Sequence, residues 1–103
     1  MTDVVLVLTT VPVDFVLSGF ARTLVEQGHA ACVSVLGEVE STYRWQGAIE
    51  AARERQVLIK TTADRVAALE AAITALHPYD VPEFLVLPTA GGSEAYLSWV
   101  RAT

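Results

Sequence analysis

Hydrophobic and polar positions follow a strand-helix-strand order in the first third of the chain. Residues 4 to 10 (VVLVLTT) form a continuous β-branched and apolar run, which predicts a strand buried within a sheet. After Pro12, which suits the first turn of a helix, apolar residues recur at helical spacing until Gly28 offers a left-handed stop. The positions of this helical stripe are Val13, Val16, Leu17, Phe20 and Leu24.

The middle of the chain predicts a long hairpin. Residues 31 to 36 are strand-like, and β-branched and aromatic residues continue the pattern to a turn at residues 46 and 47, with a bulge expected at Gly37. Local propensity favours helix over residues 48 to 56, but a turn that follows one extended arm favours a second extended arm. Each arm, of roughly 14 residues, would reach on the order of 45 Å and overhang its own sheet. We expect the unpaired edges of this overhang to pair with a neighbouring subunit.

The last third predicts a helix, a strand and a short terminal helix. Asp64 fits the N-cap or first turn of a helix with one apolar stripe, formed by Val66, Leu69, Ile73 and Leu76. Residues 84 to 87 (FLVL) predict the fourth strand, which Pro88 ends, and Ser93 fits the cap of the last helix. The order βαββαβ predicts an α+β, ferredoxin-like fold with helices on one face of an antiparallel sheet, in a single domain over residues 1 to 103.

Composition favours self-association. A hydrophobic content of 52% is high for a chain of 103 residues, so apolar surface is expected between subunits. A net charge of −5 with seven scattered basic residues argues against nucleic acid as a partner. Cys32 is expected to be buried, in a reducing compartment. The apolar run near the start is too short for a signal core or a membrane span, so we expect a cytoplasmic protein without a membrane partner.

Residues 77 to 83 (HPYDVPE) combine two prolines with ionisable side chains. The prolines fix the backbone and extend the residue before each of them, which predicts a rigid loop that either meets a ligand or only leads into the last strand. His77 and Glu83 would be roughly 20 Å apart on an extended path.

Several ordered motifs together resemble the CutA family of divalent cation tolerance proteins. They are AACV at residues 30 to 33, YRWQG at 43 to 47, Glu54, Lys60 with Thr61, the 77 to 83 motif, and YLSW at 96 to 99. The resemblance implies a homotrimer assembled through the long hairpin, similar in architecture to the trimeric PII signalling proteins. It also implies a link to tolerance of copper and other divalent metals, with no defined reaction.

The resemblance also suggests His77 and Glu83 as metal ligands. Joint coordination of one metal by both residues needs a turn in the loop, or residues from two subunits. Thr9 stands where some relatives carry a cysteine considered as a third ligand. Imidazole and carboxylate suit Cu(II) or another divalent cation better than Cu(I), which prefers sulfur. We therefore expect any metal bound here to be Cu2+ or a similar divalent ion.

Six further residues are candidates for a ligand pocket or a subunit interface. They are Tyr43, Trp45, Glu54, Lys60, Tyr79 and Asp80. Tyr43 and Trp45 share one face of a strand, where they either wall a pocket or pack against another subunit. Lys60 either pairs with Glu54 or Glu83, contacts an anionic ligand, or stays solvated.

Two functions remain open from the sequence. The first is a non-catalytic, trimeric protein of divalent-cation tolerance. The alternative is a PII-like sensor that binds an anionic ligand in clefts between subunits. An enzyme is not expected, because no nucleophile or phosphate-loop motif was found.

Overall fold

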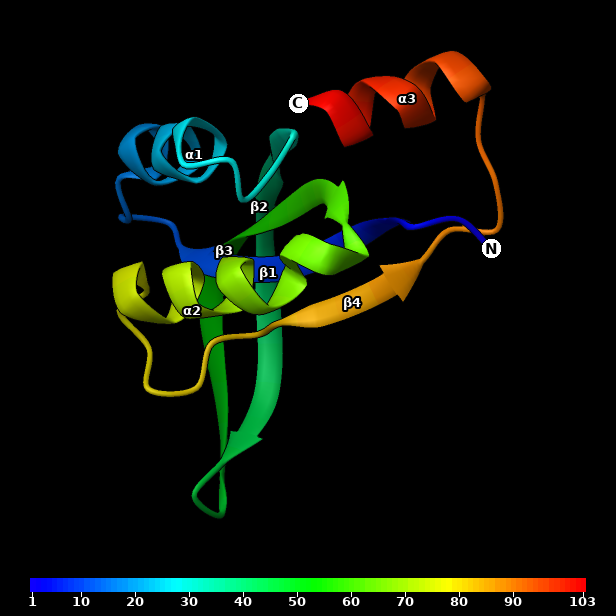
Figure 1. The fold of residues 1–103 in the computed structure, drawn as a ribbon. Coiled ribbons are helices and arrows are strands. Elements are labelled where there is room, and N and C mark those ends of the chain that lie inside the picture. Colours follow the sequence, from blue (N-terminus) through cyan, green and yellow to red (C-terminus); the bar gives the residue numbers. More distant parts are fainter.

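A four-stranded antiparallel sheet forms the centre of the molecule (Figure 1). The computed structural model describes residues 1–103, and the sheet order is β2-β3-β1-β4. The strands are β1 (Val4–Pro12), β2 (Cys32–Trp45), β3 (Ala48–Thr62) and β4 (Leu85–Pro88). The helices are α1 (Leu17–Glu26), α2 (Val66–Leu76), which follows a 3-10 turn (Ala63–Arg65), and α3 (Glu94–Ala102). The predicted ferredoxin-like α+β fold is confirmed.

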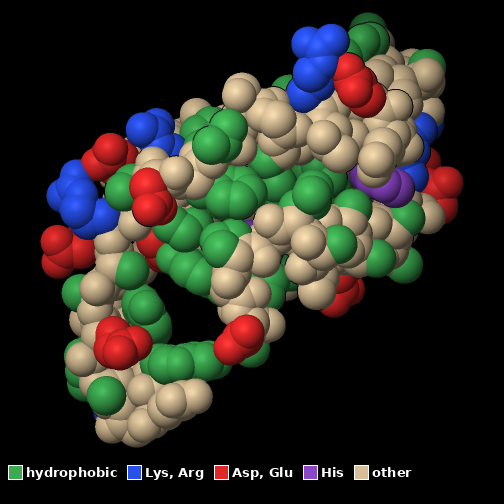
Figure 2. All heavy atoms as spheres, turned by 90° about the vertical axis from the view of Figure 1, so that its left-hand side faces the viewer, with side chains coloured by type: hydrophobic (Ala, Val, Ile, Leu, Met, Phe, Trp, Pro, Cys, Tyr) green, Lys and Arg blue, Asp and Glu red, His purple; other side chains and the backbone are tan.

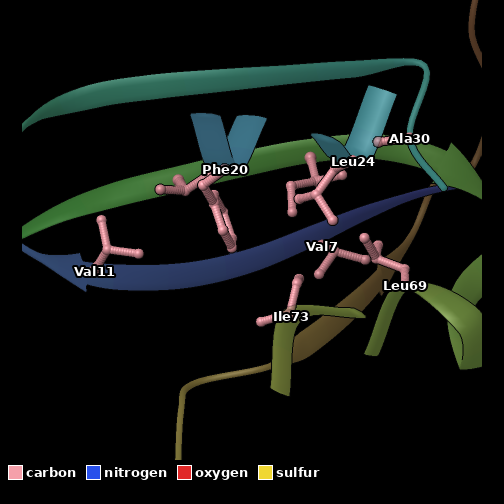
Figure 3. Close-up of a cluster of buried hydrophobic side chains, with 9 residues drawn as sticks. Val7, Val11, Phe20, Leu24, Ala30, Leu69 and Ile73 are labelled. Carbon is pink, nitrogen blue, oxygen red and sulfur yellow. The ribbon is translucent and has the colours of Figure 1, made fainter. Parts of the chain in front are cut away.

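The main core lies between the sheet and helices α1 and α2. Val7 lies opposite Ile59 in the β1–β3 register, so both side chains point to the same face of the sheet. Phe20 and Leu24 from α1 and Leu69 and Ile73 from α2 pack onto this face (Figure 3). The first predicted stripe is therefore buried at its last two positions, and the second at its two central positions.

Helix α3 covers one end of the opposite face. Val4, three residues before Val7, points to this face and packs with Leu97 and Val100 of α3. The α3 helix begins at the predicted cap, where the side chain of Ser93 accepts a hydrogen bond from the Tyr96 amide. None of the helices is long and apolar enough to cross a membrane.

The β2–β3 hairpin extends beyond the rest of the sheet, as predicted. β1 pairs with β3 only as far as Glu54, so residues 48–53 of β3 pair with β2 alone. Gln46 and Gly47 form the turn with φ of 50° and 82°, the left-handed pair that a two-residue hairpin turn requires. A register shift between Val35 and Glu38 confirms the bulge at Gly37. The extended conformation of residues 48 to 56 shows that strand pairing overrides their local helix propensity.

The first helix has the predicted end but a different beginning. Gly28 has φ of 75°, and the His29 amide donates to the Leu24 carbonyl, which closes the helix by a left-handed cap. The expectation that Pro12 opens the helix was wrong, because Pro12 is the last residue of β1 and pairs with Glu54. A proline at a strand end leaves little of the hydrogen-bond ladder unmade. The helix begins only at Leu17.

Three further local expectations need correction. Cys32 is half-buried, since it points away from the face that α1 and α2 cover. The fourth strand is Leu85–Pro88, so Phe84 precedes it and Pro88 belongs to it, at the end where the missing amide is tolerated. Asp64 lies in the 3-10 turn, where its carboxylate accepts a hydrogen bond from Thr62.

Candidate functional site

A pocket of about 570 Å³ lies between the hairpin and the loop that precedes β4. This volume is within the range of small-molecule sites. Figure 2 shows the molecule hollowed beside the hairpin, with acidic and hydrophobic side chains at the rim. The lining residues are Thr10, Ser41, Tyr43, Trp45, Glu50, Glu54, Pro78, Tyr79, Asp80, Val81, Pro82 and Glu83.

Strand alternation brings the sheet residues of the pocket onto one face. Tyr43 lies directly opposite Glu50 in the β2–β3 register, and Trp45 is two residues further along β2. Glu54 is four residues beyond Glu50 on β3, so it points to the same side. The hairpin therefore places two aromatic rings and two carboxylates on one face of the sheet.

Glu54 anchors the floor of the pocket. It is only 6% exposed, and its Oε2 accepts hydrogen bonds from the Tyr79 hydroxyl at 3.0 Å and from the Thr10 hydroxyl at 3.2 Å. Burial, followed by the hydrogen bond to Glu54, raises the pKa of Tyr79 from 10.0 to about 12. The phenol is therefore held in its neutral, donating form.

The lining of the pocket is acidic. Its ionisable side chains include four carboxylates, those of Glu50, Glu54, Asp80 and Glu83, and no lysine, arginine or histidine. Facing walls of one charge sign focus the electrostatic potential in a cleft. The pocket therefore favours a cation.

A glutamine bridge fixes Glu83 to the sheet. The Gln56 Nε2 group donates to the Thr9 carbonyl at 3.0 Å and to Glu83 Oε2 at 3.2 Å. The side chain of Thr9 is fully buried, and its hydroxyl lies 3.5 Å from the Thr10 carbonyl. Glu83 thus has a defined position at the edge of the pocket, while Thr9 offers this bridge only its backbone oxygen.

His77 joins the loop to β1. It is 8% exposed, its Nδ1 accepts from the Tyr79 amide at 3.0 Å, and its Nε2 lies 2.6 Å from the Thr10 carbonyl. This pair of contacts requires the proton on Nε2, which donates to the carbonyl. The ring also stacks on Phe15, with centroids 6.3 Å apart.

The predicted metal ligands do not form a ready metal centre. Both ring nitrogens of His77 are in hydrogen bonds, so the ring could coordinate a metal only after releasing the Tyr79 amide. No group of three or more His, Cys, Asp or Glu side chains is placed to hold a metal ion. Coordination by His77 and Glu83 stays a prediction.

Comparison with known proteins then identifies the family. The model of the CutA1 divalent ion tolerance protein family matches residues 5–103. The chain belongs to this family. The "Divalent-cation tolerance protein CutA" of Thermus thermophilus is 44% identical, over 98% of this chain and 96% of the relative. That of Pectobacterium atrosepticum is 41% identical, over 100% and 94%.

Solved CutA structures share the fold. The structure of the Thermus thermophilus protein superposes with a TM-score of 0.91 at 42% identity and covers 96% of both chains. CutA1 from a psychrotrophic Shewanella bacterium gives 0.90 at 36% identity, over 96% of this chain and 92% of that one. Relatives differ in the compartment that their names state, since an Arabidopsis thaliana protein is called chloroplastic and an Archaeoglobus fulgidus structure periplasmic. A cytoplasmic location for this CutA1 chain stays a prediction.

Most of the candidate residues of this CutA1 chain meet at the pocket. Its lining includes Tyr43, Trp45, Glu54, Tyr79 and Asp80, together with Glu83. These residues come from two strands and one loop, so the fold brings together what the sequence separates. The two roles of the aromatic side chains, in a ligand pocket or in a subunit interface, stay predictions.

Lys60 lies apart from this group. It pairs with Leu6 and Cys32 in the sheet, six residues along β3 from Glu54. Of the three alternatives for Lys60, the ion pair with Glu54 or Glu83 is absent, because Lys60 forms no ion pair with either. At roughly 3.3 Å per residue the strand separates Lys60 from Glu54 by about 20 Å.

Sequence reasoning missed four polar residues of the site, namely Thr10, Ser41, Glu50 and Gln56. Glu50 was open to prediction, since a two-residue turn at 46 and 47 places it opposite Tyr43. Thr10 and Gln56 carried no signal, because threonine in a strand and glutamine beside it are common. Only the tertiary contacts show that they hold Glu54 and Glu83.

Proposed function

We propose that this chain is a non-catalytic, trimeric CutA1 protein that acts in the response to divalent cations and binds a divalent cation in the acidic pocket. The observation that carries the proposal is the pocket itself, with four carboxylates and no basic side chain in its lining. Membership of the divalent ion tolerance family supports a divalent ion as the bound cation.

Exposed apolar side chains on the hairpin support assembly. Six large hydrophobic residues of the hairpin are exposed in the single chain, namely Val35, Leu36, Val39, Tyr43, Trp45 and Ile49. The β4 strand, at the other edge of the sheet, exposes Leu85 by 56%. Unpaired strand edges that carry apolar side chains are typical of surfaces that pair with another copy. The number of three subunits is what the sequence resemblance to the CutA family implies.

The charge of the lining favours a cation over the anionic ligand of a PII-like sensor. Phosphate or carboxylate recognition uses arginine, lysine or backbone amides at a helix start. The pocket contains no arginine or lysine, and Lys60, Arg53 and Arg55 are absent from its lining. An anion would therefore meet like charge on the carboxylates that line the pocket.

The state of Tyr79 favours binding over catalysis. A group that transfers protons works best with a pKa near the working pH. The pKa of Tyr79 is raised to about 12, away from neutrality, and its hydroxyl donates a hydrogen bond to Glu54. Tyr79 thus holds a carboxylate in place.

The carboxylates would bind a divalent ion with modest affinity. Hard divalent cations such as Mg2+ bind to carboxylate oxygens while keeping several of their water ligands. Such an ion suits this pocket, where the acidic side chains are not already gathered around one metal position. Cu(II) or Zn(II) would gain a stronger ligand if His77 released the Tyr79 amide.

Calorimetric titration of the metal-free protein tests the proposal. We expect Mg2+, Zn2+ or Cu2+ to bind at micromolar to millimolar concentration, and Glu83→Gln to weaken the binding. Glu70→Gln, an equal loss of charge on an exposed position of α2, should leave it unchanged. An affinity that is equal in all three proteins, or no heat with any of the ions, would contradict a cation site in this pocket.

A further inference from the structure

The carboxylate of Glu54 has one oxygen without a protein partner. Both donors, Tyr79 and Thr10, bind Oε2, and no donor contacts Oε1. No fully buried side-chain oxygen in the structure lacks a partner, so Oε1 must be open to the pocket that Glu54 lines. A residue that is only 6% exposed thus presents a single acceptor to the cavity.

An aromatic wall stands beside this acceptor. Tyr43 and Trp45 line the same pocket and keep 41% and 40% of their surface exposed in the single chain. Pro78 and Pro82 add apolar surface from the loop. Aromatic faces attract cations, and indole attracts them most strongly. The pocket therefore combines negative charge with surface that carbon atoms can contact.

A bare metal ion uses little of this arrangement. It needs several oxygens converging at about 2.0 to 2.6 Å, and no three acidic, cysteine or histidine side chains converge in this way. It would also leave most of a volume of about 570 Å³ to water. An ammonium group needs only acceptors and aromatic faces, and its carbon chain can cover apolar surface.

We propose that the pocket binds an organic ammonium ion. The ammonium group donates to Glu54 Oε1, and the carbon chain lies against Tyr43 and Trp45. Because four carboxylates line the pocket, an aliphatic diammonium ion binds more tightly than a monoammonium ion of similar length. This inference rests on the proposed function in using the same cation pocket, and it names a different class of cation.

Titration with three compounds of similar length separates charge from shape. The probes are 1,4-diaminobutane, butylamine and 1,4-butanediol, each added to the full-length protein at pH 7.5 while tryptophan fluorescence and heat are recorded. We expect the diamine to bind most tightly, butylamine about tenfold more weakly, and the neutral diol not at all. Raising the salt concentration should weaken the binding of the diamine and leave the result with the diol unchanged.

Two variants locate the site. Glu54→Gln keeps an acceptor for the Tyr79 and Thr10 hydroxyls but removes the charge. It should lower the affinity for the diamine about tenfold or more. Asp80→Asn removes a carboxylate of the pocket at an exposed loop position, so it alters no buried contact. It should lower the affinity for the diamine about threefold. Glu70→Gln on α2 is the charge-matched control and should bind as the unmodified protein does.

The outcomes distinguish the ligand class from the wider function. Equal binding of diol and diamine, or equal binding by the Glu54 and Glu70 variants, would overturn the ammonium site. Metal binding without amine binding would overturn it while leaving the proposed function standing. Amine binding without metal binding would support the ammonium site and refute a divalent-cation site.

Discussion

The Tyr79→Phe substitution tests the contact on which the pocket depends. It removes one hydroxyl that donates to Glu54 Oε2 at 3.0 Å and leaves the ring that packs 4.8 Å from the His77 ring. A hydrogen bond to a charged group contributes about 1.5 to 3 kcal/mol. The Thr10 hydroxyl remains as a donor and water can enter the pocket, so we expect the free energy of unfolding to fall by about 1.5 kcal/mol at pH 7.

The pH dependence of this loss has a definite sign. A tyrosine in the unfolded chain has a pKa near 10, while that of Tyr79 is raised to about 12 in the fold. The fold thus favours the neutral phenol, and the stabilisation is complete below about pH 10 and is lost as the pH rises toward 12. Taken in full, this rise in pKa would correspond to roughly 2.7 kcal/mol of folding free energy. Water in the pocket screens the interaction, so we expect a loss nearer to about 1.5 kcal/mol.

Urea unfolding followed by circular dichroism, at matched protein concentration from pH 7 to 11.5, measures the effect. The difference between the unmodified protein and Tyr79→Phe should be constant to about pH 10 and shrink above it. Tyr43→Phe is the matched control, because the Tyr43 hydroxyl has no hydrogen bond in the structure, and it should change stability by less than about 0.5 kcal/mol. Equal stability of all three proteins, or a difference that does not vary up to pH 11.5, would refute the role assigned to the Tyr79 hydroxyl.

Three further predictions concern assembly, the hairpin turn and metal binding. Light scattering should give a mass near three times 11.1 kDa, and Trp45→Ala should weaken the assembly by about 3 kcal/mol; a monomer at micromolar concentration would refute the interface. Gly47→Ala should lower stability by about 1 kcal/mol in thermal unfolding, since φ is 82° there and no neighbour would meet the new methyl group; an unchanged melting temperature would contradict this. His77→Ala should lower Cu(II) affinity at least about tenfold in calorimetry if the imidazole coordinates, whereas an unchanged affinity would assign the metal to carboxylates such as Glu83.

The sequence predicted the parts of the fold that local rules determine. The turn at Gln46 and Gly47 and the cap at Gly28 depend on left-handed backbone conformations that few residues adopt. The bulge at Gly37 follows from a glycine inside a strand pattern. The long apolar run of β1 and the helical stripe around Leu69 depend on periodicity. Each of these signals is contained within a few neighbouring residues.

The errors arose where tertiary pairing decides. Pro12 is compatible with both a helix start and a strand end, and only its pairing with Glu54 selects the second. Cys32 has apolar neighbours on both sides, but strand alternation turns it away from the core that Val33 joins. For Lys60 the sequence left an ion pair, an anionic ligand and solvation as alternatives, and the distance along β3 excludes the ion pair with Glu54.

The sequence predicts most of the residues that form the candidate site, but not the contacts between them. Residues 77 to 83 and the aromatic pair of β2 stand out by residue type, and both reach the pocket. Nothing in the sequence indicated that His77 uses both ring nitrogens on backbone groups, or that Glu54 would be the buried acceptor of two hydroxyls. Such contacts depend on which strand lies beside which loop.

The hairpin would link the proposed assembly to the proposed ligand binding, because the same overhang carries residues assigned to both. Tyr43 and Trp45 lie on the overhanging part of the hairpin, beyond the end of β1. There they line the pocket and are also exposed on the surface where another subunit could pack. A partner that packed on these rings would narrow the pocket and remove water from around Glu54. Lower solvent access would strengthen the attraction between this carboxylate and a bound cation. Cation affinity should therefore rise with assembly, and by linkage a bound cation should in turn stabilise the assembled form.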